Sequence, residues 1–276
     1  MQQACNRCVI ARLPPVALIS QKSSLRADFC QLPLGGSLGV LPHQYNQFEY
    51  IPNGVNKMKK PQFLTGNMLK LLAAFSMLLD HAGLLFFPTE MGFRIAGRLA
   101  FPIFAFMIAE GCKYTRSRWR YWGMIAGLAA VCQIVYFVAA GDTYLSVLVT
   151  FSLAIPVVWV LMELQKKKTL PWALAFAALA AAVAGLNKVL TIDYGFWGCM
   201  LPVWVAAIPG AHCVGLLTGL IFLNWDIGGL QWYSLLAVLP LLCYNGTVGK
   251  RKMKYFFYIF YPAHLAVLQG LYWLLG

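Results

Sequence analysis

The stretch MLKLLAAFSMLLDHAGLLFF, residues 68–87, is apolar and long enough to cross a bilayer as one helix. Near its end an acid and an imidazole stand side by side, Asp80 and His81, and Arg94 and Arg98 follow at the head of the next apolar stretch. A charged side chain in hydrocarbon costs about 3 kcal/mol on insertion scales, so such residues usually serve a function. We therefore interpret these four residues as a reaction centre or a relay inside a membrane.

The composition of the whole chain indicates an integral membrane protein. Of 276 residues, 60% are hydrophobic and 11% are charged, whereas soluble domains contain about 25% charged residues. The apolar segments have the length of helices and lack the ten-residue alternation of a transmembrane barrel. We therefore predict an all-α, polytopic transmembrane helical bundle in the inner (cytoplasmic) membrane.

The net charge of +13 comes mostly from short basic clusters between the apolar segments. The clusters lie at residues 59–60, 113–120, 166–168 and 250–254. Cytoplasmic loops carry such an excess of Lys and Arg, so the bilayer explains the basicity and no nucleic-acid partner is expected.

About nine spans are expected, with the N-terminus inside. This arrangement places all four basic clusters in the cytoplasm, whereas fusing the two short segments 194–208 and 212–225 would place residues 250–254 outside. The opposite loops then hold four acids and one lysine, Glu90, Asp142, Asp193, Asp226 and Lys188. The expected spans are 67–87, 94–112, 121–140, 144–164, 170–187, 194–208, 212–225, 231–244 and 255–275.

The first 57 residues differ from the rest of the chain, because they contain many Gly, Pro and Gln residues and no sustained apolar run. We expect residues 1–57 to be a disordered extension, or the product of an over-long reading frame, and residues 58–276 to form a single transmembrane domain. Cys5 and Cys8 form a CxxC pair without a second pair or a suitably spaced histidine, so no metal is expected.

The first span presents one polar face. At 100° per residue Lys70, Ala74, Met77 and His81 share that face, and Lys70 lies about 16 Å from His81 along the axis. Asp80 is rotated off the face, so it is more suited to orienting or neutralising a neighbour. Arg94 and Arg98 stand four residues apart and therefore lie on one side of the second helix.

Other polar residues in or beside the apolar segments are candidate ligand-binding residues. Each has a simpler interpretation: an intramembrane histidine is often an interhelical contact, an acid suits a helix start, and arginines in a loop set topology. The candidates are Glu110, Asp193, Tyr194, Tyr261, His264, Arg116 and Arg118.

Several blocks of these residues, taken in order, resemble the TraX family over residues 58–276. The blocks are LDHAG at 79–83, RIAGRLAFPIFAF at 94–106, AEG at 109–111, DYG at 193–195 and FYIFYPAHL at 257–265. The resemblance implies a polytopic acetyltransferase, because the founding members N-acetylate the conjugative pilin subunit with acetyl-CoA. It implies an acceptor that is a pilin-like peptide or another envelope molecule.

The TraX family is also similar to the membrane acyltransferases called acyltransferase family three. Those proteins carry acyl groups from cytosolic acyl-CoA to acceptors at the outer face, and a first-helix histidine is central to them. His81 matches that histidine, and Arg94 and Arg98 match the arginine-bearing second helix.

From these residues we expect an acetyl-transfer mechanism. An imidazole exchanges protons near neutral pH, so His81 is the expected general base. Arg98, helped by Arg94, is expected to stabilise the oxyanion, while Asp80 orients His81 or balances the arginines. Lys70 is expected to mark a cytoplasmic site for the CoA phosphates.

The remaining candidates complete this expected site. Tyr261 and His264 are expected to line a tunnel for the acceptor or the thioester, with Glu110, Asp193 and Tyr194 as further substrate-binding residues. Arg116 and Arg118 either hold the CoA phosphates or only set the topology.

Two other classes of protein compete with the enzyme interpretation. A proton-coupled transporter would use Asp80, His81 and Glu110 as a relay, but no internal repeat is visible in the sequence. A non-catalytic assembly factor has no reason to keep two arginines facing a histidine within the bilayer.

Overall fold

The computed structural model describes residues 62–140, 144–249 and 253–275. The expected extension, residues 1–57, its boundary at residue 58, and most of the basic cluster at 250–254 lie outside these ranges. All described residues belong to one compact unit, Asn56–Gly276.

The described residues form helices, joined by short connections, with no strand among them beyond two isolated bridges. The all-α prediction is therefore confirmed. The elements are α1 (Gly66–Phe86), α2 (Met91–Gly97), α3 (Ala100–Tyr114), α4 (Arg118–Ala140), α5 (Val147–Lys167), α6 (Leu170–Val189), α7 (Gly195–Ala207), α8 (His212–Ile227), the 3-10 helix η1 (Gly229–Ala237), α9 (Val238–Leu242) and α10 (Lys254–Leu275).

Five stretches of the described chain are long and apolar enough to cross a membrane, namely α1, α2 with α3, α4, α5 and α6. Three further apolar stretches, α7, α8 and η1 with α9, are shorter. The protein is thus a helical membrane protein. The expected total of nine spans and the inside position of the N-terminus stay predictions.

The second expected span, residues 94–112, lies within the apolar stretch Met91–Tyr114, which is long enough to cross a membrane. It is not one continuous helix, because it is broken between Gly97 and Ala100. Pro102 has no N–H to donate to the carbonyl of Arg98, four residues earlier, and its ring crowds that carbonyl. The chain tightens here instead, since the amide of Arg98 bonds the carbonyl of Ile95 at 3.1 Å. The break places Arg98 at a helix end.

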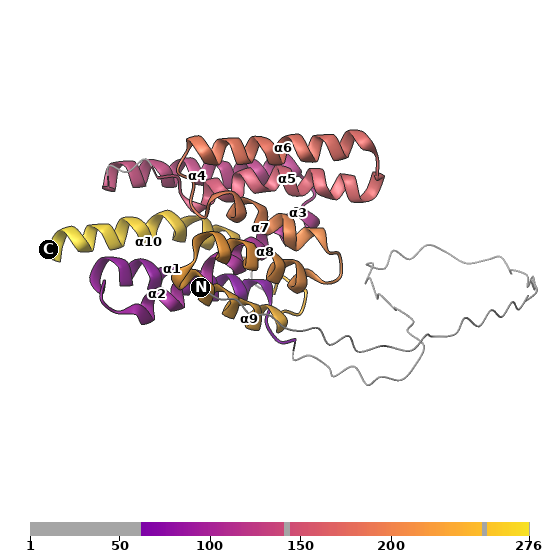
Figure 1. Cartoon of the computed structure of the whole chain (residues 1–276). Coiled ribbons are helices and arrows are strands. Elements are labelled where there is room, and N and C mark those ends of the chain that lie inside the picture. Colours follow the sequence, from indigo (N-terminus) through magenta and orange to yellow (C-terminus); the bar gives the residue numbers. More distant parts are fainter. Residues whose placement is uncertain (1–61, 141–143, 250–252, 276) are drawn as a thin grey trace, which may run out of the picture. The chain divides into compact units, whose positions relative to one another are not determined.

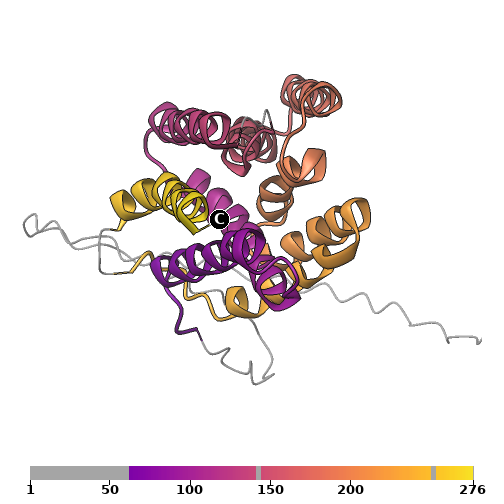
Figure 2. The ribbon, with the colours of Figure 1, turned by 90° about the vertical axis from the view of Figure 1, so that its left-hand side faces the viewer.

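The long helices lie side by side (Figure 1). Helix α10 packs against both α1 and α4, and the two views agree in placing it between them (Figures 1 and 2). Helix α5 packs against α3, α4, α6 and α7. The fully buried apolar side chains include Leu69, Ile103, Ile155, Leu201 and Leu216, so the core extends from α1 across α3 and α5 to α7 and α8.

The start of α1 is held by the segment that precedes α10. Thr65 caps α1, because its hydroxyl accepts from the Met68 amide at 3.4 Å. The Leu64 amide donates to Cys243 and the Asn245 amide donates to the Leu64 carbonyl, at 3.0 and 2.9 Å. These bonds fix the beginning of α1 close to the segment that leads into α10.

Candidate active site

A cavity of about 520 Å³ lies between α1, α2, α3, α4 and α10. One part of its wall is charged or polar, and another is formed by leucine and valine side chains of α1, α4 and α10. The cavity brings together many of the residues singled out by the sequence: Asp80, His81, Arg94, Arg98, Asp193, Tyr194 and Tyr261.

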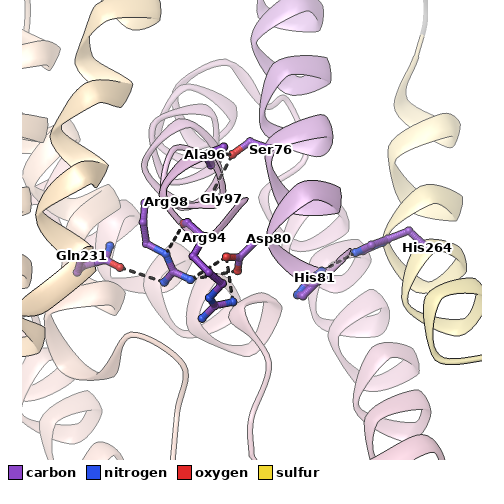
Figure 3. Close-up of polar contacts among 9 residues, drawn as sticks. All are labelled: Ser76, Asp80, His81, Arg94, Ala96, Gly97, Arg98, Gln231 and His264. Carbon is purple, nitrogen blue, oxygen red and sulfur yellow. Dashed lines mark hydrogen bonds and ion pairs between the residues drawn. The ribbon is translucent and has the colours of Figure 1, made fainter. Parts of the chain in front are cut away.

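Both arginines of the second span bind the same carboxylate (Figure 3). Arg98 Nη2 lies 2.9 Å from Oδ1 and 3.1 Å from Oδ2 of Asp80. Arg94 Nη1 lies 3.0 Å from Oδ1. One carboxylate therefore faces two guanidinium groups. Of the two roles expected for Asp80, this geometry fits the balancing of the arginines.

Arg98 is held on its other sides as well. Its Nη1 donates to Gln231 Oε1 at 3.3 Å, and its Nε donates to the Arg94 carbonyl at 3.3 Å. The side chain of Arg98 is 14% exposed, whereas that of Arg94 is 27% exposed. Arg98 is thus fixed in a frame of hydrogen bonds formed by Asp80, Gln231 and the Arg94 carbonyl. Arg94 is the more accessible cation of the pair.

The helix break and a glycine allow α2 to approach α1 closely. A Cβ atom on Gly97 would overlap the side chain of Asp80, so only glycine permits this contact. Ser76 Oγ donates to the carbonyls of Ala96 at 2.5 Å and Gly97 at 3.3 Å, which have no normal helical partner at the break (Figure 3).

His81 faces α10 rather than the arginine cluster (Figure 3). Its Nδ1 lies 3.0 Å from Nε2 of His264, and the two rings are stacked with centroids 5.1 Å apart. Among the described residues that line the cavity, His81 is present and His264 is not. The expected role of His264 as a lining residue therefore has no geometric support, and its position is behind His81.

The far wall of the cavity comes from the connection between α6 and α7. Tyr194 has φ +60° and stacks on Phe101 at 3.8 Å between centroids. Asp193 Oδ1 accepts from the Tyr144 hydroxyl at 3.1 Å, and the Asp193 carbonyl accepts from Thr150 Oγ1 at 2.7 Å. Burial raises the pKa of Asp193 to about 6, although the Tyr144 hydrogen bond and the charge of Arg98 oppose the shift.

Lys70 lies in the wall of a second cavity, of about 170 Å³. That cavity is mainly apolar and is lined by α1, α3, α4, α5 and α10. Three residues line both cavities and therefore stand between them, namely Met77, Phe104 and Tyr261. Of the predicted face of α1, Lys70, Met77 and His81 line one or both cavities, whereas Ala74 is buried and lines neither.

Three other predicted residues lie away from both cavities. Glu110 is buried, and its Oε1 lies 4.0 Å from Nε2 of His212 on α8. Arg118 pairs with Glu163 of α5 at 2.6 Å, and Arg116 is exposed. The structure does not bring these residues to His81.

Sequence reasoning missed several residues of the site. Gln231 and Ser76 contact the arginine cluster and its helix break, and Tyr136, Tyr144 and Gln269 line the large cavity. The signal for Gln231 was present, because an amide side chain inside an apolar segment needs a polar partner.

Comparisons with known proteins identify the family of the chain. The TraX family model, described as TraX protein, matches residues 65–272. The chain is also 27% identical over 242 residues to a probable fimbrial assembly protein FimC, serogroup H1, of Dichelobacter nodosus, covering 72% of this chain and 92% of that protein. No solved structure matches. The matched range runs from the start of α1 to residue 272 within α10 and includes every residue that lines the large cavity, and the chain belongs to the TraX family.

Proposed function

We propose that this chain is an integral membrane acetyltransferase, which moves an acetyl group from cytosolic acetyl-CoA to an acceptor at the membrane or its outer face. One observation carries the proposal. His81 lines a large cavity among apolar helices, the wall of the same cavity carries two guanidinium groups, and His81 is itself held by a second imidazole. A base next to fixed positive charge is what acyl transfer from a thioester requires.

In the proposed reaction His81 takes a proton from the N–H or O–H group of the acceptor. The acceptor atom then attacks the thioester carbonyl, and the resulting oxyanion needs a cation nearby. The intermediate collapses with cleavage of the C–S bond, and the leaving sulfur takes the proton back from the His81 imidazolium. The acetyl group ends on the acceptor, and free CoA is released.

The two arginines have different parts in this proposal. Arg94 meets the oxyanion, because its side chain is the more exposed of the two and it lines the cavity. Arg98 holds the frame, because it binds both oxygens of Asp80 and the amide of Gln231. The sequence predicted the opposite division, with Arg98 as the main residue that stabilises the oxyanion and Arg94 as its helper.

The two cavities support a donor route that begins at Lys70. In the predicted topology Lys70 lies nearer the cytoplasm than His81, and its ammonium group suits a phosphate of CoA. The second cavity, mainly apolar, would take the pantetheine arm. Met77, Phe104 and Tyr261 would then form the passage through which the acetyl group reaches His81.

The name of the similar protein bears on the acceptor. That relative is described as a probable fimbrial assembly protein, so a pilin-like subunit is the acceptor class to test first. The leucine and valine part of the cavity wall suits the apolar segment of such a subunit.

The transporter alternative receives less support from the geometry. Its relay would pass through Asp80, His81 and Glu110. However, Asp80 is bound by two arginines, and Glu110 lies by His212 outside the cavity.

The decisive experiment compares cells with and without the gene, and with His81→Ala. Intact-mass analysis of envelope peptides and glycans should show an acetyl group, 42 Da, that disappears with either change. His81→Ala should lower acetylation by at least about 100-fold, because the general base is gone.

A control variant separates chemistry from folding. His212→Ala replaces a histidine of α8 that lies outside both cavities and should leave acetylation unchanged. Membrane insertion of all variants is checked by extraction and gel filtration. Normal acetylation by an inserted His81→Ala protein would reject the proposal.

A further inference from the structure

His264 is a buried imidazole that the proposed transfer does not itself use. It is 6% exposed and lies on α10, one residue layer behind the cavity wall. A lone polar ring at this depth normally needs a partner on each nitrogen. His264 has two, and together they determine where its proton lies.

The hydrogen-bond chain can be followed from the backbone outward. Nδ1 of His264 lies 2.9 Å from the carbonyl of Phe260, which can only accept, so Nδ1 carries the proton. In the neutral ring Nε2 of His264 is then an acceptor. Its neighbour at 3.0 Å, Nδ1 of His81, must be the donor. The lone pair of His81 is thereby left on Nε2.

The packing around His264 keeps this chain in place. Its ring is stacked on Phe260 with centroids 4.9 Å apart and planes 8° apart. Tyr261 meets it edge-on at 5.6 Å and 84°. With one aromatic ring against its face and another at its edge, His264 has little freedom to rotate.

We propose that His264 is the positioning residue of the site, which holds His81 in the Nδ1–H form with Nε2 as the base. The inference rests on the proposed acetyl transfer, because it assigns His264 a part in that reaction. In many enzymes a carboxylate accepts the hydrogen bond that orients the catalytic histidine. Here a neutral imidazole accepts that bond, and it adds no further charge to an apolar layer. It also keeps accepting the Nδ1 proton of His81 when His81 becomes an imidazolium.

Two substitutions of His264 separate orientation from packing. His264→Gln keeps an acceptor within reach of His81, through its amide oxygen, whereas His264→Leu has none. Each protein is reconstituted in native membrane vesicles with endogenous acceptors, and CoA release from acetyl-CoA is measured. His264→Leu should lower kcat by about 100-fold and leave KM for acetyl-CoA within about twofold, since substrate binding is untouched. His264→Gln should restore kcat to within about tenfold of the natural protein.

His212→Gln is the matched control, because Nδ1 of His212 also bonds a backbone carbonyl, that of Val205, at 3.1 Å. Its kcat should not change. The protonation of His81 is read directly by solid-state 15N NMR of histidine-labelled protein, with signals assigned through the His81→Ala and His264→Leu variants. The natural protein should show His81 protonated at Nδ1 and unprotonated at Nε2, and His264→Leu should lose that preference.

The inference is overturned by normal kcat in His264→Leu, or by a His81 signal protonated at Nε2 in the natural protein. Absence of CoA release from the natural protein would reject the transfer reaction instead. The 15N spectrum needs no substrate, so it decides the arrangement of the two rings in either case.

Discussion

Asp80 and His81 are adjacent on α1, yet they belong to two different clusters. Asp80 faces α2, where two guanidinium groups contact its carboxylate within about 3 Å. His81 faces α10, where its one polar contact among the described residues is another imidazole. Consecutive residues on a helix point about 100° apart, and this rotation separates the ion pairs of Asp80 from the imidazole pair of His81.

This difference indicates that the Asp80 cluster contributes mainly to stability and that the His81 pair contributes mainly to the proposed chemistry. A buried carboxylate between two arginines leaves uncompensated charge when one member is removed. Removing one member of a neutral imidazole pair leaves no uncompensated charge. Substitutions on the Asp80 side should therefore affect folding first, and substitutions on the His81 side should affect turnover first.

The largest expected effect on stability is that of Asp80→Asn. It leaves Arg94 and Arg98 facing each other without a counter-charge, and should cost about 3 to 5 kcal/mol of unfolding free energy. Unfolding is followed by loss of helical circular dichroism during titration of detergent-solubilised protein with SDS. His81→Gln is the comparison on the other cluster and should cost about 1 kcal/mol or less. Equal losses in the two variants would contradict the division.

The two arginines should respond unequally to lysine. Arg98→Lys loses the two-oxygen contact with Asp80 and the bond to Gln231, and should cost about 2 to 3 kcal/mol. Arg94→Lys keeps a charge for its single contact and should cost about 1 kcal/mol. The same SDS titration measures both. If Arg94→Lys proved the more damaging to folding, Arg98 would not be the residue that holds the frame.

Gly97→Ala tests the close approach of α2 to α1. Its Cβ atom would overlap Asp80, so the helices must separate, at a cost of about 1 to 3 kcal/mol, with a matching loss of acetylation. Gly92→Ala is the matched control on the same helix, since a Cβ there meets no atom within 4 Å. It should be neutral or slightly stabilising. Equal behaviour of the two variants would show that the contact with Asp80 does not matter.

Periodicity predicted the part of the site that one helix carries. The spacing of Lys70, Ala74, Met77 and His81 predicted one face of α1. In the structure Lys70, Met77 and His81 line two neighbouring cavities, and Ala74 is buried without lining either. The rotation of Asp80 off that face was also predicted. Both follow from the geometry of a helix, which the local sequence determines.

Periodicity does not say which helix a face will meet. His81 and His264 are 183 residues apart, and their contact depends on α10 lying between α1 and α4. For the same reason Glu110 was expected at the site but lies by His212. The break after Gly97 was readable, because Pro102 removes a helical hydrogen bond, but its apolar surroundings favoured one continuous span.

The last prediction concerns pH and the wall opposite His81. Burial raises the pKa of Asp193 from its ordinary value of 3.8 to about 6 in the folded protein. The folded state then binds this proton more tightly than the unfolded state, so the contribution of Asp193 to stability falls as pH rises from about 4 to about 6 and is level above that.

Asp193→Asn fixes the neutral form and keeps an oxygen for the Tyr144 hydroxyl. The variant should therefore come closest to the natural protein near pH 4, and its advantage in thermal unfolding midpoint should grow up to about pH 6 and remain at pH 7.5. Taking the difference between the two proteins at each pH removes the titration of the histidines, which both share. A difference that is flat with pH would mean that folding does not shift the pKa of Asp193, and a difference that moves in favour of the natural protein as pH rises would mean that Asp193 is stabilised as an anion. The Asp193 wall would then belong with the charged cluster of Asp80 rather than with the neutral pair of His81 and His264.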